Sequence, residues 1–397
     1  MMKLFRVLLI MFLSTLMLLS CDNSVSVVVE EEIASSPTSL ELPSDSGMES
    51  VMITSNCDWT AEVLPVDAID ASWVILSKSK GFGDASVGFR IMENKYNLQR
   101  KASIVFTTTG GKTTSVLIIQ QAAEDGEELS SIDVRIGSYN IRLSTEDKDQ
   151  KYPERLWSVR KERLWSSIQD CDFDVVGLQE VTAAAQVELE EKWGNIYDMY
   201  FFSPYSKDGK GDKAQGLMYR KSDFILSDTH FFWIGPDPDS MSSSDIDSKQ
   251  NKYNRGGYCG FLTHKASGIK MFFMNTHGCL NKDTGALYAG LFEEMEKRYN
   301  PDGLPAFFVG DLNATPDHQM IKTITSYWTD SFVTAKSKTG IVNTFNSYTN
   351  SDGLRRIDYI LYRNVAAPTH YCCDNTLYGG QFASDHFPVY ADFTIGE

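Results

Sequence analysis

The chain has 397 residues, of which 42% are hydrophobic and 23% are charged, so the composition indicates folded domains rather than a disordered or collagen-like chain. This length exceeds one ordinary domain and suits two or three. The formal net charge of −16 argues against a protein that coats nucleic acid through a basic face, because such binding depends on Lys and Arg. Seven scattered cysteines without a Cys-x-x-Cys pair argue against a disulfide scaffold and a thiolate zinc site.

The N-terminus has the pattern of an export signal. Two basic residues precede an apolar run over residues 7–19, which is too short for a membrane-spanning anchor. The run ends in Leu18-Leu19-Ser20-Cys21, which resembles the bacterial lipoprotein signal and implies lipidation of Cys21; an ordinary secretory signal is the alternative. We therefore expect a signal peptide over residues 1–20, a polar tether over residues 21–38, and a protein anchored by lipid in the bacterial cell envelope.

Residues 39–122 predict a small β-sandwich. Short segments of alternating polarity recur at close spacing and are separated by glycine-containing turns, with no helical periodicity. Because a sandwich of this size needs buried aromatic residues, we expect Trp59 and Trp73 in its core.

Three short motifs of this segment resemble the Bacteroidetes-associated module known as BACON. They are Cys57-Asp58-Trp59, Ser72-Trp73-Val74 and the closing Ile119-Gln120-Gln121. The resemblance implies an immunoglobulin-like sandwich, for which contact with carbohydrate is one expectation. The simpler alternative, which we favour, is a spacer between the lipid anchor and the rest of the chain.

An acidic linker is expected over residues 123–131, followed by a large α/β domain over residues 132–397. Trp157, Leu164 and Ile168 share one face of a helix predicted over residues 154–169, and Thr182 is a suitable N-cap for the next helix. Leu287, Leu291 and Met295 are expected to stack on one later helix. Apolar segments predict strands over residues 134–142, 174–181, 269–276, 304–309, 357–362 and 389–395.

Polar residues stand at the ends of these strands, where propensity does not explain them. A buried strand that ends in a polar group incurs a cost in free energy unless that group meets a ligand. The set is rich in oxygen donors and lacks cysteine, so it suits Mg²⁺ or Mn²⁺ together with a phosphate. Its members are Asn140, Glu180, His277, Asp311, Asn313, Asp358, Asp385 and His386.

Six motifs that contain these residues occur in the order found in the endonuclease/exonuclease/phosphatase superfamily. The resemblance implies a deoxyribonuclease I-like fold, which is a four-layer α/β/β/α sandwich, and a metal-dependent phosphoric ester hydrolase. The motifs are Ser138-Tyr139-Asn140-Ile141-Arg142, Gly177-Leu178-Gln179-Glu180-Val181, Asn275-Thr276-His277, Gly310-Asp311-Leu312-Asn313, Arg356-Ile357-Asp358-Tyr359-Ile360 and Ser384-Asp385-His386.

The resemblance implies a divalent metal held by Glu180, Asn140 and Asp385. It also implies that His386 contacts the scissile phosphate, with Asp358 bonded to its other ring nitrogen. An ion pair of Asp358 with a neighbouring arginine is the structural alternative.

The remaining roles concern water and the leaving group. Asp311 would orient or deprotonate the attacking water, although His386 is an alternative base, and Asn313 would donate to phosphate oxygens. His277 would be a second phosphate donor and a candidate general acid. The carboxylate that orients His277 is expected near residues 212–217, but this stretch offers Gln215 and no clear match.

The substrate is expected to be a small phosphorylated molecule, a phosphoglycan or a phospholipid head group rather than long nucleic acid, and the protein to be a monomer. The loops predicted to shape the cleft are residues 201–213 and 231–260, and the second is rich in Ser and Asp, with Lys249, Lys252 and Arg255 as its only cations. Phosphodiesters and phosphomonoesters both stay open as substrates. The alternative is a catalytically inactive, glycan-binding surface lipoprotein; the presence of every expected catalytic residue favours the enzyme.

Overall fold

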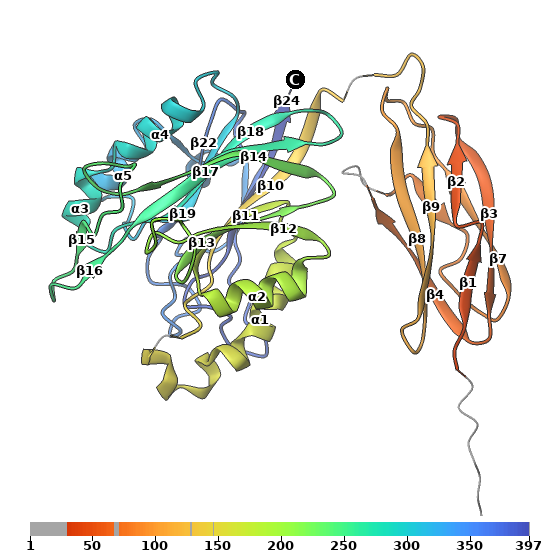
Figure 1. Cartoon of the computed structure of the whole chain (residues 1–397), viewed down its shortest axis with the longest axis horizontal. Coiled ribbons are helices and arrows are strands. Elements are labelled where there is room, and N and C mark those ends of the chain that lie inside the picture. Colours follow the sequence, from red (N-terminus) through yellow and green to blue (C-terminus); the bar gives the residue numbers. More distant parts are fainter. Residues whose placement is uncertain (1–29, 67–70, 128, 146, 397) are drawn as a thin grey trace, which may run out of the picture.

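A computed structural model describes residues 30–66, 71–127, 129–145 and 147–396, which form two β-rich units joined by one connection (Figure 1). The predicted signal peptide and the lipidation of Cys21 lie outside the described residues and stay predictions. Within the described part of the chain, no helix is both long enough and apolar enough to cross a membrane.

The N-terminal unit is a sandwich of two sheets. Trp59 and Trp73 are only 2% and 3% exposed, which confirms their predicted place in its core. One sheet consists, in spatial order, of β1 (Ile33–Ser36), β3 (Gly47–Ser55), β7 (Ala85–Ile91) and β5 (Val74–Leu76). The other consists of β2 (Ser39–Leu42), β9 (Thr113–Gln120), β8 (Arg100–Thr108), β4 (Asp58–Pro65) and β6 (Lys80–Phe82).

Both predicted boundaries of this unit differ from the structure. The sandwich begins at β1, inside the segment expected to be a tether, because the polar Ser35 hydroxyl bonds to Thr114 and the strand pairs with β3 along the sheet edge. At the other end, the expected linker is bonded to the sandwich as far as Glu127, whose amide donates to the Lys95 carbonyl. Polar composition concealed both pairings, since edge strands need no apolar alternation.

The C-terminal unit contains two larger sheets, of seven and six strands. The first runs, in spatial order, β12 (Tyr197–Phe202), β13 (Ala214–Arg220), β11 (Val175–Val181), β10 (Ser131–Asn140), β24 (Val389–Gly396), β23 (His370–Cys373) and β21 (Ser337–Gly340). The second runs β14 (Phe224–Trp233), β17 (Gly256–His264), β18 (Lys270–His277), β19 (Ala306–Asp311), β22 (Asp358–Arg363) and β20 (Thr329–Asp330).

Helices cover the outer face of each sheet, which gives the predicted four-layer α/β/β/α sandwich (Figure 1). Helices α1 (Trp157–Cys171) and α2 (Ala183–Trp193) pack on the first sheet, and α3 (Lys282–Leu287), α4 (Leu291–Tyr299) and α5 (Gln319–Ile324) on the second. The short elements are η1 (Asp147–Lys151), η2 (Pro153–Arg155), α6 (Ser331–Thr334) and the hairpin of β15 (Asp245–Ile246) and β16 (Lys252–Tyr253).

The predicted helix details hold in part. Leu164 and Ile168 are buried, and the Thr182 hydroxyl accepts from the Ala185 amide as an N-cap. The stack expected on one later helix is wrong for Leu287, which ends α3 and is 73% exposed, whereas Leu291 and Met295 are buried on α4. The chain turns between the two helices, so the helical spacing does not continue across them.

A buried amide, Asn275, connects the two sheets. Its side-chain N–H groups donate to the carbonyl oxygens of Leu178 and Gly216, both at 3.0 Å, and lie 3.3 Å from the Tyr258 hydroxyl. Its side-chain oxygen accepts from Gln179 at 2.9 Å. Since β18 lies in one sheet and β11 and β13 in the other, these bonds fix how the sheets face each other.

Asn275→Ala should lower the free energy of unfolding by about 2–4 kcal/mol, because it leaves polar groups buried between the sheets without partners. Asn375→Ala is the matched control, since that amide makes one exposed bond to the Ser351 carbonyl, and its cost should stay within about 0.5 kcal/mol. Denaturant unfolding of both variants measures the difference; equal losses would contradict a connecting role for Asn275.

Candidate active site

The polar strand ends meet at one open cleft of about 720 Å³. Pairing of β18, β19 and β22 places His277, Asp311 and Asp358 in one row across the second sheet. Six of the eight predicted site residues line the cleft, and the other two, Asn140 and Asp358, are fully buried directly behind it. The structure therefore brings all eight into one constellation.

His386 and Asp358 form a buried hydrogen-bonded pair. The His386 Nδ1 lies 2.9 Å from one Asp358 carboxylate oxygen and 3.2 Å from the other, and the Thr344 hydroxyl also donates to that carboxylate. The structural alternative, a pair with Arg355 or Arg356, is not seen among the described residues: Arg356 pairs with Asp330, and Arg355 forms no ion pair with Asp358. Burial alone would lower the pKa of His386, but the charges of Asp358 and Asp311 outweigh it and raise the pKa to about 10.

Asp311 is the centre of the constellation. One carboxylate oxygen accepts from the Asn140 amide at 3.0 Å and lies 3.5 Å from His277 Nε2 and 3.6 Å from His386 Nε2. The other oxygen accepts from the Asn313 backbone N–H at 2.8 Å. Burial raises the pKa of Asp311, so this carboxylate is a stronger proton acceptor than an exposed aspartate.

Glu180 reaches the cleft from a bulge in β11. Its backbone is left-handed, with φ of 64°, where the register of β11 against β13 shifts. The carboxylate accepts from the Leu143 N–H at 2.9 Å and from the Asn140 amide at 3.3 Å. Burial would raise the pKa of Glu180, but His277, Arg142 and the Leu143 N–H together lower it to about 2, so the group is ionised.

The surroundings of the Asp385 carboxylate suit a bound cation. Its Oδ1 is buried and has no hydrogen-bond partner among the described residues, while its Oδ2 lies 3.3 Å from Arg142. A buried carboxylate oxygen without a donor is costly unless a cation or water meets it. Glu180, Asp385 and the amide oxygen of Asn140 could therefore hold a hard divalent ion such as Mg²⁺.

A second group of possible ligands is Asp311, Asp358 and His386, whose ligand atoms lie within 4.8 Å of one another. However, the Asp358 carboxylate is occupied by His386 Nδ1 and Thr344, so it has little capacity left for a metal. This group therefore suits a cation less well than Glu180 and Asp385 do.

Two arginines near the site, the buried Arg160 and the half-buried Arg142, were assigned no role from the sequence. Arg160, from α1, donates at 2.7 Å to the carbonyls of Ile141 and Arg142 and thereby holds the loop that follows Asn140. Arg142 pairs with Asp149 at 3.0 Å and faces Asp385. A lone arginine on a helix carries no sequence signal for such a role.

Among the described residues, Asp311 is the only carboxylate paired with His277, and an arginine lies in the same cleft. Arg255 lines the cleft beside His277 and is held by the buried Asp245 at 2.9 Å. Burial and then the charge of Arg255 lower the pKa of His277 to about 4, so the ring is neutral at neutral pH. Gln215 also lines the cleft, and its buried side-chain oxygen has no partner among the described residues.

Comparison with known proteins gives two family matches. The model of the endonuclease/exonuclease/phosphatase family matches residues 137–386, and the BACON model, an N-terminal binding domain, matches residues 58–122. No curated protein sequence matches the chain.

Several solved structures similar to this chain come from bacteria of the genus Bacteroides. An endonuclease/exonuclease/phosphatase family protein from Bacteroides vulgatus is 26% identical, with a TM-score of 0.60, over 67% of this chain and 100% of that one. A mannosyl-6-phosphatase from Bacteroides thetaiotaomicron is 25% identical, with a TM-score of 0.59, over 65% of this chain and 98% of its own. A second family protein from Bacteroides thetaiotaomicron, at 24% identity and a TM-score of 0.61 over 67% of this chain and 99% of that one, has the same fold.

Glu180→Gln should lower the affinity for Mg²⁺ at least about tenfold, because it removes the ionised carboxylate that faces Asp385 across the cleft. Titration calorimetry with MgCl₂ measures the affinity. Glu190→Gln, an exposed change of the same type on α2, should bind Mg²⁺ as the unmodified protein does. If Glu180→Gln bound Mg²⁺ as tightly as the unmodified protein, the metal site would have to lie elsewhere.

Proposed function

Because the chain belongs to the endonuclease/exonuclease/phosphatase family, whose members hydrolyse phosphate esters, we propose that it is a divalent-metal-dependent phosphoesterase acting on a small phosphorylated molecule. The observation that carries the proposal is the buried His386–Asp358 pair beside Asp311, in the same cleft as Glu180 and Asp385.

The proposed reaction is direct attack of water on phosphorus. The water oxygen forms a bond to phosphorus, its proton passes to Asp311, and the ester P–O bond breaks, with the leaving oxygen taking up a proton from a solvent water. His386, flanked by two carboxylates, is a cationic donor to a phosphate oxygen, and Asn313 is a second donor. A divalent ion bound at Glu180 and Asp385 would supply further stabilisation of negative charge on the phosphate.

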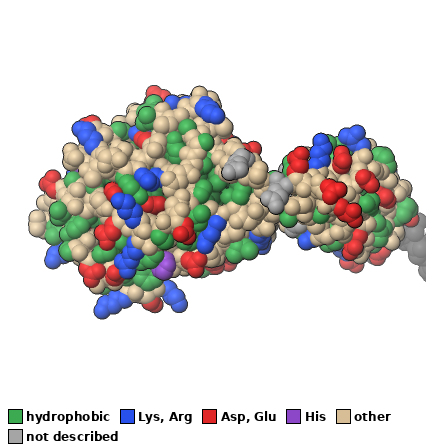
Figure 2. Space-filling view, turned by 90° about the horizontal axis from the view of Figure 1, so that it is seen from above, with side chains coloured by type: hydrophobic (Ala, Val, Ile, Leu, Met, Phe, Trp, Pro, Cys, Tyr) green, Lys and Arg blue, Asp and Glu red, His purple; other side chains and the backbone are tan. Residues whose placement is uncertain are grey.

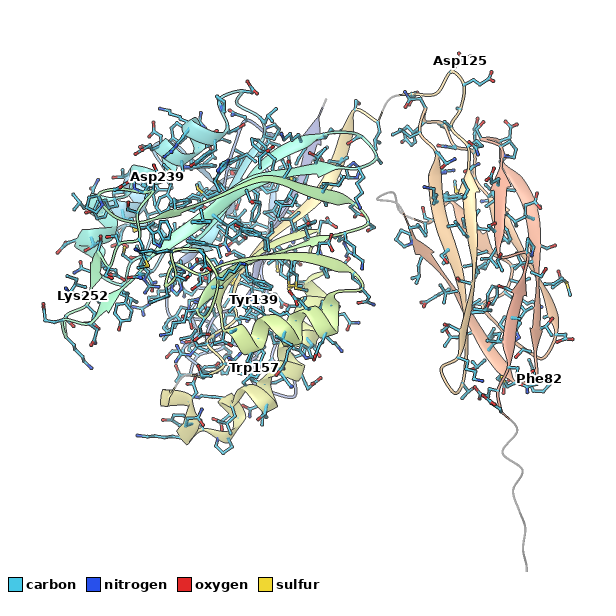
Figure 3. The ribbon with its side chains drawn as sticks, in the orientation of Figure 1. Phe82, Asp125, Tyr139, Trp157, Asp239 and Lys252 are labelled. Carbon is cyan, nitrogen blue, oxygen red and sulfur yellow. The ribbon has the colours of Figure 1, made fainter. Side chains whose placement is uncertain are left out.

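Several features support a small substrate. A cleft of about 720 Å³ has the size of a small-molecule site. On the face shown in Figure 2, Lys and Arg side chains are interspersed with acidic ones and form no continuous basic band. Lys252, one of the cations considered from the sequence, lies at the hairpin of β15 and β16 and does not line the cleft (Figure 3).

The similar mannosyl-6-phosphatase makes a phosphorylated sugar the first substrate to test. A phosphoglycan and a phospholipid head group belong to the same proposed class, because each presents a phosphate ester on a small polar scaffold. The alternative of an inactive glycan-binding protein has less support, since every predicted catalytic side chain is assembled in the cleft or directly behind it.

The purified protein should release inorganic phosphate from mannose 6-phosphate in the presence of Mg²⁺ or Mn²⁺. Excess EDTA should abolish the release, and added Mg²⁺ should restore it, because the orphaned Asp385 oxygen and Glu180 need a cation. A parallel assay with an oligonucleotide and a phospholipid tests the substrate class. Full activity in EDTA would refute the metal dependence, and preferred hydrolysis of the oligonucleotide would refute the small substrate.

Asp358→Asn should reduce turnover at least roughly a hundredfold, by analogy with the loss of an orienting aspartate from a protease triad. His386→Ala should cost as much or more, and the double variant should be little worse than His386→Ala, because the two residues act as one unit. Asp302→Asn, an exposed change of the same type, is the control. Additive losses of turnover in this double-mutant cycle would show that Asp358 has only a structural role.

A further inference from the structure

We propose that the cleft recognises a second anionic group on the substrate, besides the phosphate that is hydrolysed, and that Arg355 binds it. The inference rests on the proposed function and adds a substrate class to it. The substrate would be a small scaffold, such as a sugar, that carries a phosphate ester and one further phosphate or carboxylate.

The backbone places Arg355 in one row with His386. Phe345 pairs antiparallel with Arg355 on one side and with His386 on the other. The Phe345 amide donates to the Arg355 carbonyl at 3.0 Å. Residues paired in this way project from the same face, with Cβ atoms about 4.5–5.5 Å apart. Arg355 is therefore separated from His386 by a single side chain.

The side chains follow the same row. The Phe345 ring lies 5.0 Å from the His386 ring, edge to face, and the Arg355 guanidinium carbon lies 4.7 Å from the Phe345 ring centre. All three residues line the cleft. A guanidinium stacked on an aromatic face keeps its N–H edge free for an anion. The stacking therefore positions Arg355 to bind an anion at a defined distance from the reaction centre.

The charge of Arg355 is not neutralised within the described part of the protein. No described carboxylate forms an ion pair with it, although the whole chain has a net charge of −16. The cleft's four carboxylates either belong to the reaction centre or, for Asp149, pair with Arg142. Three further cations stand on the rim, and they are Lys151, Arg155 and Lys213.

A second arginine that lines the cleft, Arg155, is stacked on aromatic rings in the same way as Arg355. Its guanidinium carbon lies 3.8 Å from the Tyr152 ring centre and 4.9 Å from that of Tyr348. Its Nε is buried without a hydrogen-bond partner among the described residues, and it forms only a long ion pair with Glu154, at 3.8 Å. Stacked cations with weak or no ion pairing around one cleft raise the local concentration of anions and favour a ligand with more than one negative group.

The test compares kcat/KM for phosphate release from three compounds that differ only at C1. They are mannose 6-phosphate, mannose 1,6-bisphosphate and carboxymethyl mannoside 6-phosphate. The unmodified protein should prefer the two compounds with a second anion by about tenfold or more, the effect of one charge-assisted hydrogen bond. Arg355→Met should reduce this preference to about twofold or less, and Arg355→Lys should retain part of it because it keeps the charge.

Arg90→Met is the matched control, since it removes the same charge from an exposed strand position of the sandwich, and it should leave the preference unchanged. A thermal unfolding curve for each variant verifies folding. Equal kcat/KM for the three compounds, or an Arg355 variant that lowers all three equally, would overturn the inference. A stronger preference for an oligonucleotide than for the bisphosphate would also overturn it.

A binding measurement distinguishes failure of the proposed function from failure of this inference. If no compound is hydrolysed with any divalent ion, the proposed phosphoesterase activity is wrong. Calorimetric titration with mannose 6-phosphate and the 1,6-bisphosphate then decides the inference by itself. Tighter binding of the bisphosphate that is lost in Arg355→Met supports it, and equal binding of the two compounds overturns it.

Discussion

The candidate active cleft depends on how two sheets face each other, and the buried amide of Asn275 helps to fix that relation. Asn275 is fully buried, and its side chain bonds across the interface to residues of β11 and β13. An unsatisfied amide in a low-dielectric core is costly, so only one relative placement of the sheets satisfies all of its bonds. Two residues further along the same strand, His277 enters the cleft. The amide thereby aligns the edges where the polar strand ends meet.

Electrostatics within the cleft follow from burial. The acidic side chains there are shielded from water, and fixed hydrogen-bond donors take its place. Asp311 accepts from Asn140, Glu180 from the Leu143 N–H, and Asp358 from His386. In a low dielectric these interactions are stronger than in water and need no rearrangement when charge develops on a substrate. One position, Asp385 Oδ1, has no protein donor, which is the place where a cation would complete the set.

The proposed chemistry and the proposed substrate recognition lie on different kinds of segment. The residues at the reaction centre stand at the ends of buried strands, where the sheets hold them rigidly. Phe345 and Arg355 instead belong to a connection outside the long strands, yet their backbone pairing with His386 fixes them to the reaction centre. Relatives with the same fold could therefore keep the reaction and change the substrate by altering this connection.

Local patterns in the sequence predicted a large α/β domain with polar residues at its strand ends, and the family resemblance carried by six motifs predicted the four-layer architecture and the eight residues of the candidate site. The boundaries of the N-terminal sandwich were predicted less well. Strand β1 and the residues up to Glu127 are held by backbone hydrogen bonds that the polarity of the sequence does not reveal. Only the tertiary structure placed Arg160 beneath the loop after Asn140, and Arg355 one side chain from His386. These contacts join residues far apart in the chain, and an arginine's partner depends on which strands become neighbours, a property that no local spacing encodes.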